Sequence, residues 1–315
     1  MPCLATAATF QEDFSNDPVT HGWQVFGNTN LFHWDATNQN LLVTWDSSQP
    51  NSYFHRPLGT ILGRDDDFSL GFDVRFSDVA VGVNSNKSST FEIAINLLNL
   101  ARAAATNFLR GSGIDATFGP RNLVEFDYFP DSGFGATVSP TVVSSNNQFA
   151  STFNFPLEMT ANDLFHILMT YTAANQTLVT SMTRNGAPFG PVQNVVLAAG
   201  FTDFRVDNVA VASYSDEGQD PQYGGSLLAH GVVDNFVVTT PPPPVAALTG
   251  GFSNTLWQVK FLSRSNWLYT LERTADFQSW AETSQTIAGN GANLFLADTN
   301  ALPGKAFYRV HAEKP

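Results

Sequence analysis

The sequence is poor in the residues on which several classes of protein depend. It has one cysteine in 315 residues, Cys3, so a disulfide framework and a thiolate zinc site are excluded. Lysine and arginine number 15 against 28 aspartates and glutamates, which gives a formal net charge of −13. Since nucleic acids and anionic membrane surfaces are bound mainly by clustered basic side chains, we expect neither as a partner.

Long apolar runs and the common catalytic motifs are also missing. No apolar run approaches the roughly 20 residues that a transmembrane helix needs, so we expect no membrane insertion. The sequence has no Gly-x-Ser-x-Gly and no Gly-Lys-Ser/Thr, and its six histidines show no His-x-x-x-His spacing. Serine-hydrolase, nucleotide-binding and zinc-hydrolase chemistry are therefore not indicated, and we expect no organic cofactor.

What the chain has in abundance is apolar residues that alternate with polar ones. Hydrophobic residues make up 43% of the sequence and phenylalanine alone contributes 27, enough for a large core. The alternation has a period of two, which predicts strands with one buried face. It is clearest in 68–76, 91–97, 124–128 and 203–207.

Turn signals and a weak helix signal complete this pattern. The stretches 164–171 and 177–183 flank Ala-Ala-Asn-Gln as the strands of a hairpin would, and Arg-Asn-Gly at 184–186 predicts another tight turn. Only 97–109, which is rich in alanine, is compatible with a helix, and a loop accounts for it equally well. We therefore predict an all-β fold, an antiparallel two-sheet sandwich followed by a small second one.

The clearest boundary is the run of four prolines at 241–244, which favours an extended and fairly stiff linker. It separates a first domain, 10–240, from a second, 245–315. Residues 1–9 contain a small-x-small pattern like the end of a signal peptide, and we expect that they are the tail of a removed export segment. With few lysines and many Asn, Ser and Thr, this predicts a secreted or cell-surface bacterial protein.

Several segments of the first domain, in their order along the chain, resemble the concanavalin A-like lectin/glucanase family. They are Phe-Gln-Glu-Asp-Phe at 10–14 with Gly-Trp at 22–23, Val-Glu-Phe-Asp-Tyr at 124–128, the hairpin at 171–186, and Val-Asp-Asn-Phe-Val-Val at 233–238. The resemblance implies a jelly roll of two curved antiparallel sheets with ligands on the concave face or its rim loops. Lectins, laminin-G-like modules, glycosidases and lyases share this fold, so it does not by itself indicate one activity.

The second domain is similar to small C-terminal β modules of secreted Verrucomicrobia-type proteins. The similarity is carried by Trp-Leu-Tyr-Thr-Leu-Glu-Arg-Thr at 267–274, Trp280, Gly-Asn-Gly at 289–291 and Ala-Phe-Tyr-Arg-Val at 306–310. It implies an accessory role, such as attachment to the cell surface, and we assign it no chemistry.

Glu125 and Asp127 are the sharpest chemical signal, because two positions on a strand place both carboxylates on one face about 6.6 Å apart along it. The glucanase branch uses Glu-x-Asp-x-Glu or Glu-x-Asp-x-x-Glu, but the third position falls on Phe129 or Pro130, neither of which can protonate a leaving oxygen. Hydrolysis would need Asp131 or Glu92 instead.

Two other interpretations of this strand remain open. Legume-type lectins hold a metal pair with a Val-Glu-Phe-Asp strand, but the residues that complete such a site are not recognisable in 130–135. In the second interpretation, Glu125 and Asp127 are polar residues on a solvated concave strand and pair with Arg205.

A structural calcium ion often joins the first and last strands in this family, and Asp13 and Asp234 match those positions.

Carboxylates, amides and arginine on neighbouring strand faces suit the hydroxyls of a sugar, and aromatic rings suit its apolar faces. Most aromatic residues are expected in the core, but Trp34, Trp45, Tyr53 and Phe134 lie in turn-rich or polar surroundings that are compatible with exposure, and Tyr53 is favoured for binding. The residues that we expect to contact a glycan are Tyr53, His55, Arg56, Glu92, Asn96, Glu125, Asp127, Phe134, Arg205 and Asp207. We predict a carbohydrate-binding, lectin-like protein that recognises a polysaccharide on the concave face; the alternatives are a β-glucan hydrolase using Glu125 and Asp127, and a non-catalytic adhesion protein.

Overall fold

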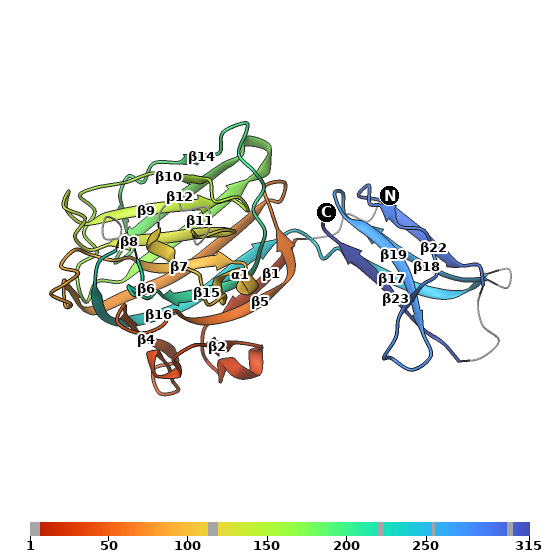
Figure 1. Ribbon diagram of the computed structural model, residues 1–315, viewed down its shortest axis with the longest axis horizontal. Helices are drawn as coiled ribbons and strands as arrows, with labels where there is room; N and C mark the ends of the chain where they lie inside the picture. Colours follow the sequence, from red (N-terminus) through yellow and green to blue (C-terminus); the bar gives the residue numbers. More distant parts are fainter. Residues whose placement is uncertain (1–6, 113–118, 220–223, 254–255, 301–304) are drawn as a thin grey trace. The chain divides into compact units, whose positions relative to one another are not determined.

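A computed structural model describes residues 7–112, 119–219, 224–253, 256–300 and 305–315 (Figure 1). The chain divides into two compact units at the start of the proline run. The larger unit is Thr9–Thr240, and Pro241–Pro315 belong to the smaller one, which is blue in Figure 1. Strands dominate both units, as predicted from the alternation.

The larger unit is a sandwich of two antiparallel sheets. The first has nine strands, and seven of them follow the order β13-β12-β11-β6-β16-β4-β3, while β1 pairs with β16 and β14 with β12. Its strands are β1 (Ala8–Glu12), β3 (Phe32–Asp35), β4 (Asn40–Asp46), β6 (Phe68–Val81), β11 (Phe165–Thr172), β12 (Thr177–Arg184), β13 (Ala187–Phe189), β14 (Val195–Val196) and β16 (Leu227–Thr240). The predicted hairpin is confirmed as β11 and β12, joined by the short 3-10 turn η4 (Ala173–Asn175).

The second sheet carries the site. It has seven strands in the order β10-β9-β8-β7-β15-β5-β2. They are β2 (Gln24–Phe26), β5 (Ser52–Leu62), β7 (Ile93–Leu98), β8 (Leu123–Phe129), β9 (Thr137–Val143), β10 (Phe149–Ser151) and β15 (Val206–Ser213). Of the predicted strand 203–207, only the part from Val206 onward is in β15.

The core lies between the two sheets and is largely aromatic. Phe72 and Phe76 on β6 pack against Phe126 and Tyr128 on β8, with ring centroids 5.6 and 5.7 Å apart. All four rings are buried, and each contributes roughly 1.5–3 kcal/mol of hydrophobic stabilisation. Because alternate residues of a strand point to opposite faces, this packing leaves Glu125 and Asp127 on the outer face of the second sheet.

Helices are few and short. They are α1 (Leu100–Ala103) and the 3-10 turns η1 (Pro18–His21), η2 (Thr29–Leu31) and η3 (Arg110–Ser112), besides η4. The stretch 97–109, left open above between helix and loop, begins with the last two residues of β7 and contains one four-residue helix, which the side chain of Asn99 caps. The rest of it is irregular. Among the described residues, no helix is long and apolar enough to cross a membrane.

The smaller unit has two small sheets and a core of its own. The first is β17 (Val245–Ser253), β18 (Leu256–Ser263) and β22 (Asn293–Asp298); the second is β19 (Leu268–Thr274), β20 (Ala281–Glu282), β21 (Ile287–Ala288) and β23 (Phe307–Glu313). Phe261 and Tyr269 have no exposed surface, and their ring centroids are 5.0 Å apart. The all-β fold with a second, smaller β unit is thus present.

Candidate functional site

The outer face of the second sheet presents two rows of side chains that cross the central strands. Glu125 pairs with Asn96 on β7 and with Thr141 on β9, while Asp127 pairs with Ala94 and Ser139. Partners in register point to the same face of a sheet. The rows therefore join carboxylates, an amide and hydroxyls, as the alternation of polar residues predicted.

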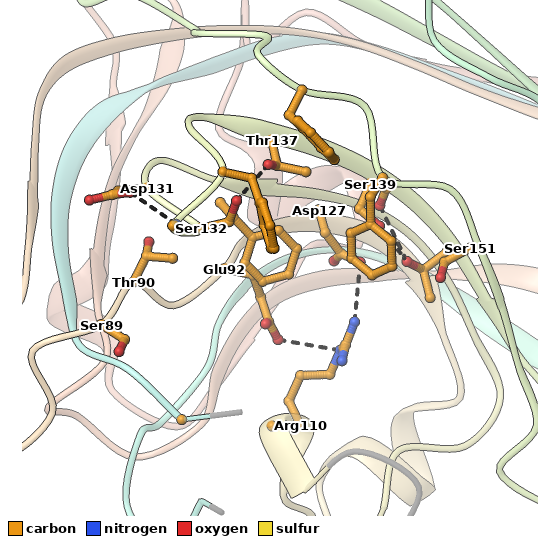
Figure 2. A pocket seen from close by; sticks show the side chains of 18 of the residues that line it. Ser89, Thr90, Glu92, Arg110, Asp127, Asp131, Ser132, Thr137, Ser139 and Ser151 are labelled. Carbon is orange, nitrogen blue, oxygen red and sulfur yellow. Dashed lines mark hydrogen bonds and ion pairs between the residues drawn. The ribbon is translucent and has the colours of Figure 1, made fainter. Parts of the chain in front are cut away.

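A cluster of three carboxyls around one guanidinium lies on these rows. Nε of Arg110 is 2.7 Å from Oε2 of Glu125 and 3.3 Å from Oε1 of Glu92, and Nη2 is 3.1 Å from Oδ2 of Asp127. Figure 2 shows Arg110 between Glu92 and Asp127. All four side chains are buried, so these ion pairs have little screening by solvent.

Glu125 is the most fully satisfied of the three carboxyls. Its Oε1 accepts hydrogen bonds from Nδ2 of Asn96 at 3.0 Å and from the hydroxyl of Tyr214 at 2.5 Å, while Oε2 faces Arg110. Burial and the charge of Glu125 raise the pKa of the Tyr214 hydroxyl, which keeps it protonated as a donor. Glu125 has no exposed surface and is not among the residues that line the pocket.

Glu92 and Asp127 are less well satisfied, and both face the pocket. Burial raises the pKa of Glu92 to about 7, an effect that Arg110 opposes and Glu125 strengthens. Burial, and then the charge of Glu125, likewise hold the pKa of Asp127 well above its usual range. Glu92 Oε1 and Asp127 Oδ1 are buried without a hydrogen-bond partner among the described residues, although Glu92 Oε1 has its ionic contact with Arg110.

A pocket of about 890 Å³ opens over this part of the sheet (Figure 2). Its inner wall carries hydroxyls from β9 and β10, and aromatic rings surround them. The hydroxyl and carboxyl side chains include Ser89, Thr90, Glu92, Asp127, Asp131, Ser132, Thr137, Ser139, Thr141 and Ser151, and the rings are Phe129, Phe134, Phe149, Phe153 and Phe155. Phe134, Phe153 and Phe155 are 74, 60 and 51% exposed, so the apolar surface is open to a ligand.

Of the residues expected to contact a glycan, Glu92, Asp127 and Phe134 line this pocket. The predicted glycan contact of Tyr53 is wrong, because Tyr53 is a core residue, and Trp45 packs in the core as well. Tyr53 donates its hydroxyl to the carbonyl of Ala103 at 3.0 Å, underneath the segment that contains α1. His55 is also buried, with Nδ1 3.0 Å from Oδ1 of Asn208.

The other expected contacts lie outside the pocket lining. The guanidinium of Arg56 lies 3.8 Å from the centre of the Phe10 ring. Asp207 accepts hydrogen bonds from the backbone N–H of Leu100 at 3.0 Å and from Nδ2 of Asn99 at 3.3 Å, so it holds the start of α1. Trp34 is half-buried and donates to the carbonyl of Phe14.

The expected pairing of Glu125 and Asp127 with Arg205 is replaced by pairing with Arg110. The backbone N–H of Arg205 donates to Oδ1 of Asn122, and Arg205 is not among the residues that line the pocket. The pairing with Arg110 had no sequence signal, because that residue belongs to an irregular segment. The pocket did have a sequence signal, because lining residues occupy every second position in two stretches. They are Thr137, Ser139 and Thr141 in the first, and Phe149, Ser151, Phe153 and Phe155 in the second.

Calcium binding by Asp13 and Asp234 stays a prediction. Oδ1 of Asp13 accepts from the N–H of Ser15, and Oδ1 of Asp234 accepts from the N–H of Asn235. Burial raises the pKa of Asp234 to about 6, and the negative charges of Asp73, Asp13 and Glu12 strengthen the effect. The described residues contain no group of three or more His, Cys, Asp or Glu arranged to hold a metal ion.

Hydrolysis through Glu125 would need a second carboxyl across an open groove. Glu92 does lie near Glu125, since both contact Nε of Arg110, but the guanidinium fills the space between them. Asp131, the other candidate acid, is exposed at the rim and accepts from the N–H of Gly133. This arrangement gives a substrate no access to Glu125.

Comparison with known proteins finds no matching family profile and no matching curated protein. Among solved structures, peanut lectin with a 9-mer peptide is 16% identical, covering 75% of this chain and 99% of that one with a TM-score of 0.44. The seed lectin of Lotus tetragonolobus is 12% identical over 74% and 98%, also with a TM-score of 0.44. The PL-14 alginate lyase of Aplysia kurodai is 11% identical over 69% and 90%, with a TM-score of 0.40. At these scores the likenesses decide nothing about function.

Proposed function

We propose that the larger unit binds a glycan in the pocket on the outer face of its seven-stranded sheet. The observation that carries the proposal is the combination of buried hydroxyls on the inner wall with exposed phenylalanine rings at the mouth. A sugar ring has hydroxyls around its edge and apolar C–H faces, so it fits a pocket of both kinds.

The aromatic rim supplies the apolar half of this recognition. Phe134 and Phe155 stack with their centroids 5.5 Å apart and their planes 29° apart. Exposed apolar clusters of this kind are uncommon on a soluble protein unless they contact a ligand or partner. We infer that the rings pack against a face of the sugar.

The polar wall supplies the hydrogen-bonding half. The hydroxyls of Ser139 and Thr141 lie 3.4 Å apart on β9, and both residues also line the pocket with Asp127. A hydroxyl both donates and accepts, so the wall can bind sugar hydroxyls in either role. This set supports binding rather than catalysis, because Glu125 is enclosed.

Export to the cell surface and attachment through Pro241–Pro315 belong to the same proposal. They are supported by the low lysine content and by the small β unit that follows the prolines. A glycan-binding unit joined to an attachment unit would hold a polysaccharide at the cell. A purely adhesive role without sugar binding would leave the hydroxyl-lined pocket unexplained.

The direct test is a glycan array that includes plant, algal and bacterial polysaccharides, probed with the full chain with and without calcium. We expect binding that falls at least about tenfold in the double variant Phe134→Ala and Phe155→Ala, because each ring contributes more than about 1 kcal/mol of contact. Phe252→Ala is the matched control, since Phe252 is equally exposed but belongs to the smaller unit. Unchanged binding by the double variant would place the glycan elsewhere, and no binding to any saccharide would reject the proposal.

A further inference from the structure

The charges that line the pocket are out of balance. Glu92, Asp127 and Asp131 line it together with Arg110, the one basic side chain among the described lining residues. Arg110 is already shared by Glu92, Glu125 and Asp127. When these carboxyls are ionised, the site therefore has more negative charges than a single guanidinium can neutralise, and the described residues supply no second cation there.

Two buried carboxyl oxygen atoms at the pocket also lack a hydrogen-bond partner in the described part of the chain, although Nε of Arg110 makes an ionic contact with one of them, Glu92 Oε1, at 3.3 Å. Glu92 Oε1 and Asp127 Oδ1 have no hydrogen-bond partner among the described residues, and both residues are more than nine-tenths buried. Buried carboxyl oxygens are normally satisfied, and one left without a donor is costly. Glu92 directly precedes β7 and Asp127 lies within β8, and both side chains line the same pocket, so a ligand there faces both.

The aromatic walls favour the same kind of ligand. The faces of phenylalanine rings carry partial negative charge and attract cations. Phe149 already has the guanidinium of Arg110 5.9 Å from its ring centre, and Phe129 and Phe153 line the same pocket. A cationic group would be stabilised both by the carboxyls and by the rings.

We propose that the glycan bound here carries an amino sugar, with its protonated amine donating to Glu92 and Asp127. An ammonium group offers three donors and one positive charge, so it can donate to both oxygens and it reduces the excess of negative charge. The hydroxyl of a neutral sugar would donate to the oxygens but leave the excess negative charge of the pocket unchanged. A uronate would add a further negative charge. This inference rests on the proposed glycan binding and specifies its chemical class.

The experiment is titration calorimetry of the full chain near pH 7 with oligosaccharides of one backbone. The probes are β-1,4-linked glucosamine tetramer, its fully N-acetylated form, cellotetraose and a glucuronic acid tetramer. We expect the free-amine tetramer to bind at least about tenfold more tightly than the acetylated and hydroxyl forms, and the uronate not to bind. Charged hydrogen bonds in a buried site account for that ratio.

Variants separate the pocket from general attraction to an acidic protein. Glu92→Gln with Asp127→Asn keeps the shape of the pocket and removes its charge, so we expect the preference for the amine to disappear. Glu282→Gln with Glu313→Gln changes the net charge equally at exposed residues of the smaller unit and should leave the preference intact.

Equal or tighter binding of cellotetraose or the acetylated tetramer by the parent would overturn this inference and leave glycan binding standing. The same holds if the two double variants lose the preference equally. If none of the tetramers and no glycan on the array binds, the proposed function itself fails. The comparison of ligands on the parent is decisive even if the pocket variant does not fold.

Discussion

Arg110 determines what the buried carboxyls of the larger unit can do. It contacts Glu92, Glu125 and Asp127. All four side chains are buried, so solvent screens their charges little. The carboxyls and Tyr214 outweigh desolvation and raise the pKa of Arg110 above its already high ordinary value, so it remains a cation. Its role is to make a carboxyl-rich pocket compatible with a stable fold.

Replacing Arg110 by methionine should therefore be severely destabilising. The substitution leaves buried carboxyls without their cation, and removal of one partner from a buried ion pair costs about 3–5 kcal/mol. Urea unfolding near pH 7 measures the change. Arg102→Met is the control, because Arg102 is exposed in the same segment and should cost well under about 1 kcal/mol. A loss of stability no greater than that of the control would contradict the role given to Arg110.

The pKa of Glu92 predicts how stability depends on pH. Burial raises it to about 7 from an ordinary 4.5, so the folded state holds the proton more tightly than the unfolded state. This contribution to the free energy of unfolding is complete below about pH 4.5 and is lost as the pH rises through about 7, a change on the order of 3 kcal/mol. Asp127 changes in the same direction.

Glu92→Gln removes the titrating group while keeping its shape. We expect the decline in the free energy of unfolding between about pH 5 and 8 to become shallower than in the parent. Chemical unfolding across that range is the measurement, with the exposed Glu282→Gln as the control for net charge. An identical decline in the parent and in Glu92→Gln would show that Glu92 does not hold a proton as described.

At the scale of single residues, the sequence predicted the sheet face on which a side chain lies better than it predicted the residues that the side chain contacts. The period of two correctly placed Glu125 and Asp127 on one face of β8 and opposite the core, because strand geometry alone fixes it. It did not predict Arg110 as their partner, since no periodicity relates an irregular segment to a strand. The glycan contact of Tyr53 was predicted wrongly for the same reason: the residues that cover Tyr53 are distant in the sequence.

At the scale of elements, the segment 99–111 decides which part of the sheet remains open. It is anchored at three places: Asp207 accepts from Leu100, the hydroxyl of Tyr53 donates to Ala103, and Nδ2 of Asn51 donates to the carbonyl of Phe108 at 3.0 Å. These bonds hold irregular backbone over the sheet, where α1 alone is too short to be stable. The pocket opens on the strands beyond this cover.

Asp207→Ala should loosen the cover without unfolding the sandwich. It removes the acceptor of the Leu100 N–H and the contact with Asn99, a loss of about 1 kcal/mol for a partly exposed charged acceptor. Hydrogen exchange should become faster in 99–104 and stay unchanged in the β11–β12 hairpin. Asp207→Asn keeps an acceptor oxygen and should show a smaller effect. Equal exchange rates in the parent and Asp207→Ala would contradict the anchoring.

The regular elements were predictable, and the irregular ones were not. The hairpin of β11 and β12 and the strands β6, β7 and β8 follow from alternation and turn residues. The segment after β7 has alanines that fit a helix, but its backbone is held by side chains of β5 and β15, which are far away in the sequence. Tertiary contacts override weak local propensity there.

At the scale of the whole molecule, each unit has its own core. The buried cluster of the larger unit is built from residues between Phe14 and Val238, and the smaller unit buries Phe261 and Tyr269. The proline run marks the boundary in the sequence because its composition is so unlike a strand. The role of the smaller unit has no comparable signal in its side chains.

Separate cores predict separate unfolding transitions. Phe261→Ala creates a cavity in the smaller unit and should cost it about 3–5 kcal/mol, which lowers the midpoint of one calorimetric transition and leaves the other in place. Phe72→Ala, in the core of the larger unit, is the reciprocal variant. Equal shifts of both transitions in either variant would show that the units unfold as one.

The central claim is that the pocket on the outer face of β8, β9 and β10 binds a glycan. The most direct measurement is a crystal structure of the full chain with the best ligand from the array. The account predicts a sugar ring packed on Phe134 and Phe155, with polar groups directed toward Ser139, Thr141 and Asp127. A ligand bound to another surface, with this pocket unchanged and containing only water, would contradict it.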